Sequence, residues 1–282
     1  MASLARHVSL RRIRLAFMIG ALAVTIGWAF DTVQRRRARR EWTHSIDVRV
    51  VLVTRDGQGN AAHWRRGLDE LSARLDADMR RWRGPGPAPF RVTLVGPVRW
   101  DGDFPSRPPT DGPLDRLWSA VEVFRTARSI DRAARDDGAR RDVRIYVFSE
   151  GGNDGFTTFA EGIGALNGDV AFVRTSSGGA LVVPMEVIGH ELLHTVGASD
   201  KYDASGHPQA PEGLADPDLV PRYPQSHAEW MAGEVALAPG AGRLPGSLTD
   251  LRVGPVTARE IGWTRAGPPP PALGVAAGRR AR

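Results

Sequence analysis

Cysteine is absent from the 282 residues of the chain. Its absence excludes a disulfide framework, a thiolate metal site and a cysteine nucleophile. Three other patterns are also missing: a G-x-S-x-G nucleophile turn, a phosphate-binding G-x-x-x-x-G-K-[ST] loop, and a dinucleotide-binding G-x-G-x-x-G after a strand. No internal repeat is present. Any chemistry must therefore come from histidine, carboxylate or hydroxyl side chains.

The middle of the chain lacks an excess of basic charge, although the net charge of the whole chain is +6. Residues 1–46 hold nine arginines and residues 265–282 hold four, which leaves 25 basic and 30 acidic residues between these two segments. A nucleic-acid-binding domain needs a basic face on its folded part. We therefore expect no nucleic acid partner.

Residues 15–30, LAFMIGALAVTIGWAF, form a run of sixteen uncharged residues with arginines on both sides. As a helix this run is roughly 24 Å long, against a hydrocarbon core of ~30 Å. A cleaved signal peptide is the alternative, but the arginines of RRRARR (35–40) disfavour export. We predict a single-pass membrane anchor (15–30) between a basic N-terminus (1–14) and a basic linker (31–46), with the remainder outside the cytoplasm. Secretion after cleavage is the other possibility.

Residues 47–197 alternate two hydrophobic patterns. Strands are predicted at 47–53, 90–95 and 143–148, and amphipathic helices at 64–82 and from 117 to about 138. This order predicts an α/β (α+β) fold with a mixed, mostly parallel sheet covered by helices. DVAFVRT (169–175) is a candidate edge strand, preceded by the glycine-rich segment 150–168.

A further helix is predicted from Pro184 to Gly197, because proline favours the start of a helix and glycine its end. Residues 198–264 are irregular apart from a short helical stretch at 256–263. We therefore divide the folded part into an upper subdomain (47–197) and a lower subdomain (198–264). The proline- and glycine-rich residues 265–282 are predicted to be a disordered tail.

The helix that precedes Gly197 carries the sequence HELLH, with His190 and His194 four residues apart. On a helix both imidazoles project from one face and can bind one ion, with Glu191 beside it as a general base. A shuffled chain of this composition contains His-Glu-x-x-His about 0.007 times. Gly197 allows the chain to turn back, so that Asp200 can supply a third ligand.

HELLHTVGASD (190–200) resembles the extended zinc signature of the metzincin clan of metallopeptidases, H-E-x-x-H-x-x-G-x-x-H, with Asp200 in place of the third histidine. Aspartate at this position is similar to the snapalysin-type bacterial neutral proteases. The resemblance implies a Zn²⁺ ion bound by His190, His194 and Asp200.

The same resemblance implies that Glu191 acts as general base and then as general acid, and that Tyr202 stabilises the oxyanion. A packing or surface role for the Tyr202 ring is the alternative. Met231, in AEWMAGE (228–234), would form the methionine turn beneath the metal. An extended peptide would pair with 169–175 if this segment is an edge strand, and the alternative is a plain buried strand. We therefore expect a membrane-anchored zinc metallopeptidase that acts on a peptide or protein substrate.

Two other functions use the same motif. A zinc-containing module could bind peptides without cutting them, although such a module has no need of the base Glu191. A zinc hydrolase could act on an amide or ester that is not a peptide. His207 and His227 lie in loops near the motif and are expected to face solvent. The sequence leaves the oligomeric state open.

Overall fold

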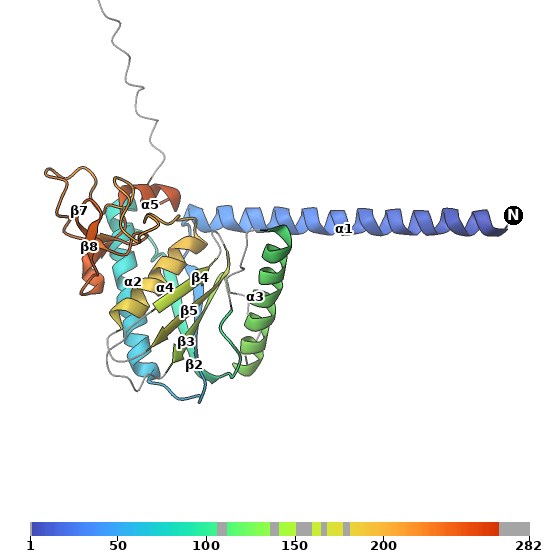
Figure 1. The fold of residues 1–282 in the computed structure, drawn as a ribbon, viewed down its shortest axis with the longest axis horizontal. Helices are drawn as coiled ribbons and strands as arrows, with labels where there is room; N and C mark the ends of the chain where they lie inside the picture. Colours follow the sequence, from blue (N-terminus) through green and yellow to red (C-terminus); the bar gives the residue numbers. More distant parts are fainter. Residues whose placement is uncertain are drawn as a thin grey trace, which may run out of the picture.

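The computed structural model describes residues 2–105, 112–135, 141–150, 160–164, 168–176 and 181–264. A five-stranded sheet with the order β2-β1-β3-β5-β4 lies at its centre (Figure 1). Its strands are β1 (Ile46–Thr54), β2 (Phe90–Arg99), β3 (Val143–Glu150), β4 (Ala160–Gly164) and β5 (Val170–Ser176). All neighbouring pairs are parallel except β4 and β5, which are antiparallel. The predicted mixed, mostly parallel sheet is therefore confirmed.

Helices cover both faces of this sheet (Figure 1). On one face lie α2 (Ala61–Arg83) and α4 (Val182–Thr195), and on the other lies α3 (Pro113–Ala133). β1 has buried side chains on both faces, as expected for a central parallel strand. Val50 belongs to the core cluster under α2 and α4, and Val51 to the cluster under α3.

The two edge strands of the sheet are β2 and β4, so the prediction that residues 169–175 form an edge was wrong. β5 pairs with β3 on one side, where Phe172 is opposite Tyr146, and with β4 on the other, where Val173 is opposite Gly162. The strand AEGIG (160–164) has one β-branched residue and two glycines, a composition depleted in strands. This composition concealed β4 in the sequence.

Helix α1 (Ala2–Glu41) includes the predicted anchor and continues through most of the predicted linker. Within the described part of the chain, no helix combines the length and the apolar character needed to cross a bilayer. The C-terminal end of α1 packs on the folded part of the chain. Trp42, directly after it, is buried and donates a hydrogen bond from Nε1 to the carbonyl oxygen of Ile261 at 2.7 Å.

The lower subdomain has little regular structure. It contains β6 (Ala228–Glu229), β7 (Val235–Ala238), β8 (Ala241–Arg243), the 3₁₀ helix η1 (Leu248–Asp250), β9 (Leu251–Arg252) and α5 (Pro255–Glu260). Asp78 of α2 ties it to the upper subdomain, because its Oδ2 accepts hydrogen bonds from Trp230 Nε1 at 3.2 Å and from the Val253 amide at 2.9 Å. The predicted tail 265–282 lies outside the described residues, as does most of 150–168.

Candidate metal centre

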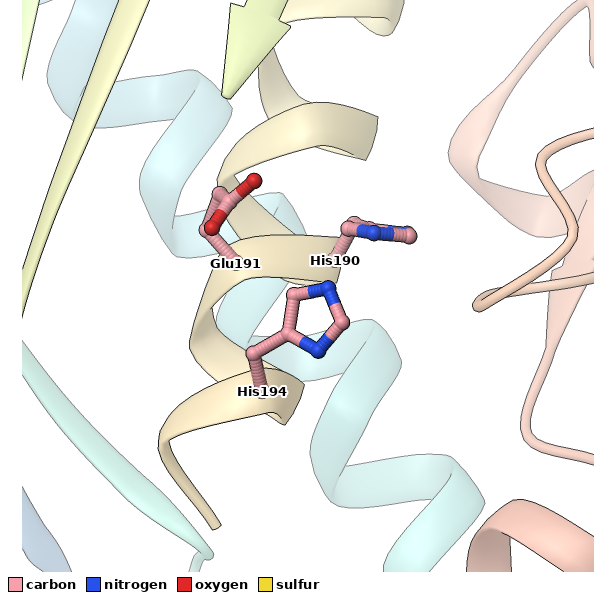
Figure 2. A group of neighbouring side chains, drawn as sticks. All are labelled: His190, Glu191 and His194. Carbon is pink, nitrogen blue, oxygen red and sulfur yellow. The ribbon is translucent and has the colours of Figure 1, made fainter. Parts of the chain in front are cut away.

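Helix α4 carries the HELLH sequence and packs against α2, β4 and β5. It begins at Val182, two residues before the predicted start, and Ile188, Leu192 and Leu193 are buried in the core. His190 and His194 lie on another side of the helix and are partly exposed, with side-chain exposures of 16% and 13%. Figure 2 shows these two rings beside Glu191 on adjacent turns. Ligand atoms of the three residues lie within 4.8 Å of one another, so the group can hold a metal ion.

Helix α4 ends in a turn centred on Gly197, which has a φ of 105°. The Gly197 amide donates to the carbonyl oxygen of His194 at 3.1 Å, and the Ala198 amide donates to that of Leu193 at 3.1 Å. These two bonds define a Schellman motif, which requires a left-handed residue at the position of Gly197. The chain therefore reverses within three residues and approaches the exposed edges of the two histidines.

Asp200 lies opposite both histidines because of this reversal. Its Oδ1 is 3.0 Å from His190 Nε2 and 3.1 Å from His194 Nε2. The structure thus brings together the three residues that the sequence suggested as metal ligands.

The second nitrogen of each imidazole is held by a backbone carbonyl. His190 Nδ1 lies 3.2 Å from the oxygen of Trp230, and His194 Nδ1 lies 2.8 Å from the oxygen of Ala198. A carbonyl oxygen can only accept, so each Nδ1 carries a hydrogen and each Nε2 faces Asp200. Each Nε2 can bind a cation through its lone pair, or donate a hydrogen to Asp200 when the ring is protonated, so the position suits a cation or a proton. Backbone bonds of this kind orient histidine ligands in metal sites.

The charges at this position favour an ionised Asp200. Hydrogen bonds from His190 and then from His194 hold the pKa of the Asp200 carboxyl far below its usual range. Burial lowers the pKa of His194, but hydrogen bonds with Asp200 and Ala198 outweigh burial and raise it overall. A cation and a proton therefore compete for the same site, as expected for metal ligands.

Glu191 and Tyr202 flank the centre on different elements. Glu191 is 4% exposed and follows His190 on α4, and its carboxylate lies within 4.8 Å of ligand nitrogens of both histidines. Tyr202 comes from the loop after Asp200, and its ring lies against that of His190 with centroids 6.3 Å apart and an interplanar angle of 27°. Its side chain is 39% exposed. Both predicted catalytic residues thus lie next to the candidate ligands.

A tight turn at residues 229–233 supports the centre from below. The amides of Ala232 and Gly233 both donate to the carbonyl oxygen of Glu229 at 3.0 Å, and Met231 at the apex is fully buried. The Trp230 carbonyl, which holds His190, belongs to the same turn. Met231 thus lies in a tight turn that contacts the centre through the Trp230 carbonyl, and its role as a methionine turn stays a prediction.

No protein family model matches the chain, and no curated protein sequence matches it either.

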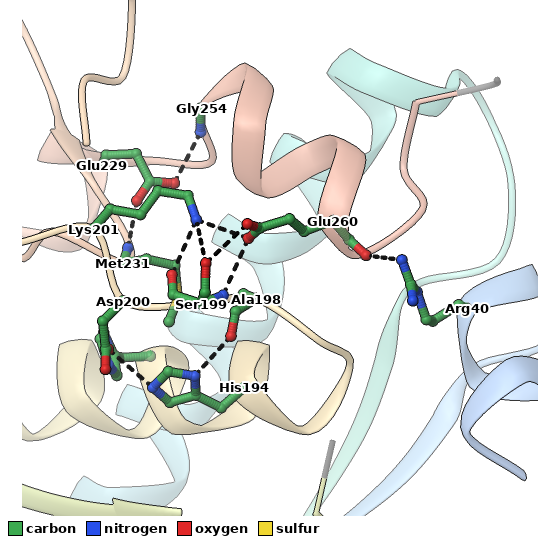
Figure 3. A network of polar contacts seen from close by, with 11 residues as sticks. Arg40, His194, Ala198, Ser199, Asp200, Lys201, Glu229, Met231, Gly254 and Glu260 are labelled. Carbon is green, nitrogen blue, oxygen red and sulfur yellow. Dashed lines mark hydrogen bonds and ion pairs between the residues drawn. The ribbon is translucent and has the colours of Figure 1, made fainter. Parts of the chain in front are cut away.

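The loop that carries Asp200 is held by a polar network that sequence analysis missed (Figure 3). Lys201 is 2% exposed, and its Nζ donates to Glu260 Oε2 at 2.7 Å and to the carbonyl oxygen of Ser199 at 3.0 Å. The Ser199 amide and hydroxyl donate to the Glu260 carboxylate at 3.1 and 2.8 Å. Arg40, from the end of α1, donates to the backbone carbonyl of Glu260. In the sequence, the only sign of this network is the charged residue Lys201 next to Asp200. No regular spacing links Lys201 to Glu260.

The two remaining loop histidines have different surroundings. His207 Nδ1 lies 3.0 Å from Glu234 Oε2, and this contact raises the pKa of His207. Burial, with the positive charge of Arg252, lowers the pKa of His227. Neither histidine is a partner of Asp200. His207 is partly exposed, as expected, but it has a specific acidic partner that the sequence did not indicate.

Proposed function

We propose that this protein is a zinc-dependent metallopeptidase of the metzincin type, with aspartate as the third zinc ligand. The observation that carries the proposal is the approach of His190 Nε2 and His194 Nε2 to one oxygen of Asp200, at 3.0 and 3.1 Å. Imidazole nitrogens with a carboxylate oxygen are typical zinc ligands, and three protein ligands leave a position for water.

The residues around the centre suit hydrolysis of a carbonyl compound. A zinc ion bound by His190, His194 and Asp200 would supply a water of lowered pKa and polarise the substrate carbonyl. The Glu191 carboxylate takes the proton from the attacking water and returns it to the leaving amine. The Tyr202 hydroxyl donates a hydrogen bond to the oxygen on which negative charge develops. The buried position of Glu191 and the stacking of Tyr202 on His190 support these roles.

A peptide is the proposed substrate because, among the described strands, β4 is paired on one side only and contacts α4. β4 is the edge strand on the side of α4, and β5 covers only one of its two hydrogen-bonding sides. An extended peptide can pair with such an edge through backbone hydrogen bonds. This contact would bring its carbonyl groups past α4.

The proposal is tested by metal content and turnover of the purified full-length chain. Elemental mass spectrometry should find about one zinc per wild-type chain and none after His190→Ala. Glu191→Ala should retain the zinc and lose hydrolysis of a quenched-fluorescent peptide library by at least a hundredfold. His44→Ala, at an exposed position distant in sequence, is the matched control. A folded wild-type chain that binds no zinc would refute the proposal.

Two experimental results would assign the same metal centre to a protein of another functional class. If the zinc-loaded chain binds peptides but never cuts them, and Glu191→Ala changes nothing, the protein is a zinc-containing binding module. If it hydrolyses simple esters or amides and no peptide, it is a zinc hydrolase with another substrate. Either result would retain the metal centre and remove the peptidase assignment.

We also propose that α1 anchors the protein in a membrane in a single pass, although its apolar run (15–30) is shorter than the hydrocarbon core of ~30 Å. Its described apolar side chains between residues 15 and 30 are all more than half exposed: Leu15, Phe17, Met18, Ile19, Leu22, Val24, Ile26 and Phe30. Such a surface is unfavourable in water. The full-length chain should resist extraction from membranes by carbonate, whereas a chain that begins at residue 38 should be released. A mature N-terminus near residue 30, found by mass spectrometry, would instead indicate secretion after cleavage.

A further inference from the structure

Glu186 is a buried carboxyl group that the proposed reaction does not use. It precedes His190 by four residues, so it lies on the same face of α4, one turn or about 6 Å along the axis. The residue is 7% exposed. Among the described residues, Glu186 has no hydrogen-bond or ion-pair partner. A buried carboxyl group without a partner is unfavourable and calls for a functional explanation.

Glu186 points toward the segment that follows the methionine turn. Its Oε1 lies 3.3 Å from the position that a Cβ on Gly233 would occupy, so a side chain at residue 233 would press on the carboxyl group. The adjacent residue is Glu234, whose Oε2 pairs with His207 Nδ1 at 3.0 Å. Burial, and then the charge of Glu234, raises the pKa of Glu186 to about 8. The charge that acts on Glu186 is therefore of its own sign.

We propose that Glu186 and Glu234 form an acidic subsite that binds the cationic side chain of a lysine or arginine next to the scissile bond. This inference rests on the proposed peptidase function. Glu186 is one helical turn from His190, and successive residues of an extended peptide are about 3.3 Å apart. A long side chain next to a carbonyl at the metal can therefore reach Glu186.

The two carboxyl groups suit a guanidinium or ammonium group better than a metal ion, and a bound cation favours the ionised form of Glu186. A guanidinium brings five N–H donors, and a carboxylate can accept two of them in parallel. Calcium requires six to eight oxygen ligands. The cluster offers the oxygens of Glu186 and Glu234, one of which His207 already occupies. We therefore expect a cationic side chain rather than a second metal ion.

The test uses the full-length zinc-loaded chain and quenched-fluorescent peptides that differ only at the two positions flanking the cleaved bond. Peptides with arginine or lysine at one of these positions should have kcat/KM values about ten- to a hundredfold above those with glutamine. Glu186→Gln and Glu234→Gln should each bring this ratio close to one. Glu212→Gln, at an exposed position outside the cluster, should leave it unchanged. Cleavage without this preference, or a preference that survives Glu186→Gln, would overturn the subsite.

A binding measurement distinguishes two cases: the proposed subsite is wrong, or the proposed peptidase function is wrong. If no peptide is cleaved, the same peptides carrying a fluorophore are titrated with wild-type and Glu186→Gln chains by fluorescence anisotropy. Tighter binding of the arginine peptide that is lost in the variant supports the subsite, and equal binding overturns it. Stoichiometric calcium binding that disappears in Glu186→Gln, measured by calorimetry, would also overturn it, since the cluster would then be a metal site.

Discussion

The indole of Trp230 packs directly on the backbone of Gly189. A Cβ at residue 189 would lie 2.3 Å from Cζ3 of Trp230 and 3.0 Å from Cδ1 of Leu71. Trp230 also provides the carbonyl that holds His190. Because Gly189 has no side chain, the turn at residues 229–233 can approach helix α4 closely.

Gly189→Ala should destabilise the protein and weaken the metal site. The added methyl group overpacks the contact between helix and turn, which typically costs about 1–3 kcal/mol. The free energy of unfolding from urea titration should fall by about that amount, and zinc affinity should fall with it. Gly86→Ala is the control, because a Cβ at residue 86 would contact nothing within 4 Å. Equal stability of the two variants would contradict the packing that we describe.

Lys201→Met should loosen the loop that carries Asp200. The substitution removes the buried ammonium group and leaves the Glu260 carboxylate with only its bonds from Ser199. Glu260 is partly exposed, so we expect a loss of about 2 kcal/mol, below the ~3–5 kcal/mol of a broken, fully buried ion pair. Zinc affinity should fall about tenfold, as when other supporting partners of metal ligands are removed. Arg91→Met, which breaks the exposed pair with Asp47, should change stability by less than about 1 kcal/mol.

Glu186 should make the protein less stable as the pH rises. Burial and the charge of Glu234 raise its pKa from 4.5 to about 8. The folded state therefore binds the proton more tightly than the unfolded state. Its contribution is fully present below pH 4.5 and is lost as the pH rises to about 8.

The measurement is urea unfolding of wild-type and Glu186→Gln chains between pH 5 and 8.5. The difference in the free energy of unfolding should grow in favour of the variant by up to about 1.4 kcal/mol per pH unit. Comparison of the two chains cancels the other titrating groups. A constant difference across this range would show that Glu186 titrates as it does in the unfolded chain.

Metal removal should lower the melting temperature of the wild-type chain. A ligand that binds only the folded state stabilises it by about 2.7 kcal/mol at a hundred times its Kd. For a chain of this size we expect a rise of roughly 5–10 °C on addition of zinc, reversed by a chelator. His194→Ala should show no such rise, and His44→Ala should match the wild type. Equal shifts in all three chains would place the zinc elsewhere.

Tyr202→Phe should reduce turnover without affecting metal content. The variant keeps the ring that stacks on His190 and loses the hydroxyl group. If the hydroxyl donates to the oxyanion, kcat should fall about a hundredfold with little change in KM. If the tyrosine only packs, kcat should stay within about twofold and the catalytic role would be withdrawn.

The sequence predicted those parts of the fold that follow from local patterns. The helix with HELLH and the reversal at Gly197 could be predicted because the spacing of four residues and a glycine at the end of a helix act over a few residues. The parallel sheet followed from strands that alternate with helices. These local rules were sufficient to predict that His190, His194 and Asp200 lie close together.

The parts that escaped prediction depend on contacts between distant residues. β4 has a composition that is unusual for a strand, and it exists because β5 offers it a partner. Glu260 meets Lys201 across 59 residues, and Glu234 meets His207 across 27. The hydrophobic periodicity of the sequence does not reveal such pairs, because they arise from the packing of irregular loops. The candidate specificity subsite is therefore visible only in three dimensions.

The contact between Arg40 and Glu260 gives the N-terminal helix a mechanical connection to the reaction centre. Arg40 donates to the backbone of Glu260, whose carboxylate binds both neighbours of Asp200, Ser199 and Lys201. A movement of α1 is therefore transmitted to the loop that carries Asp200. If α1 is the membrane anchor that we propose, the anchor and the candidate metal centre are coupled through Glu260.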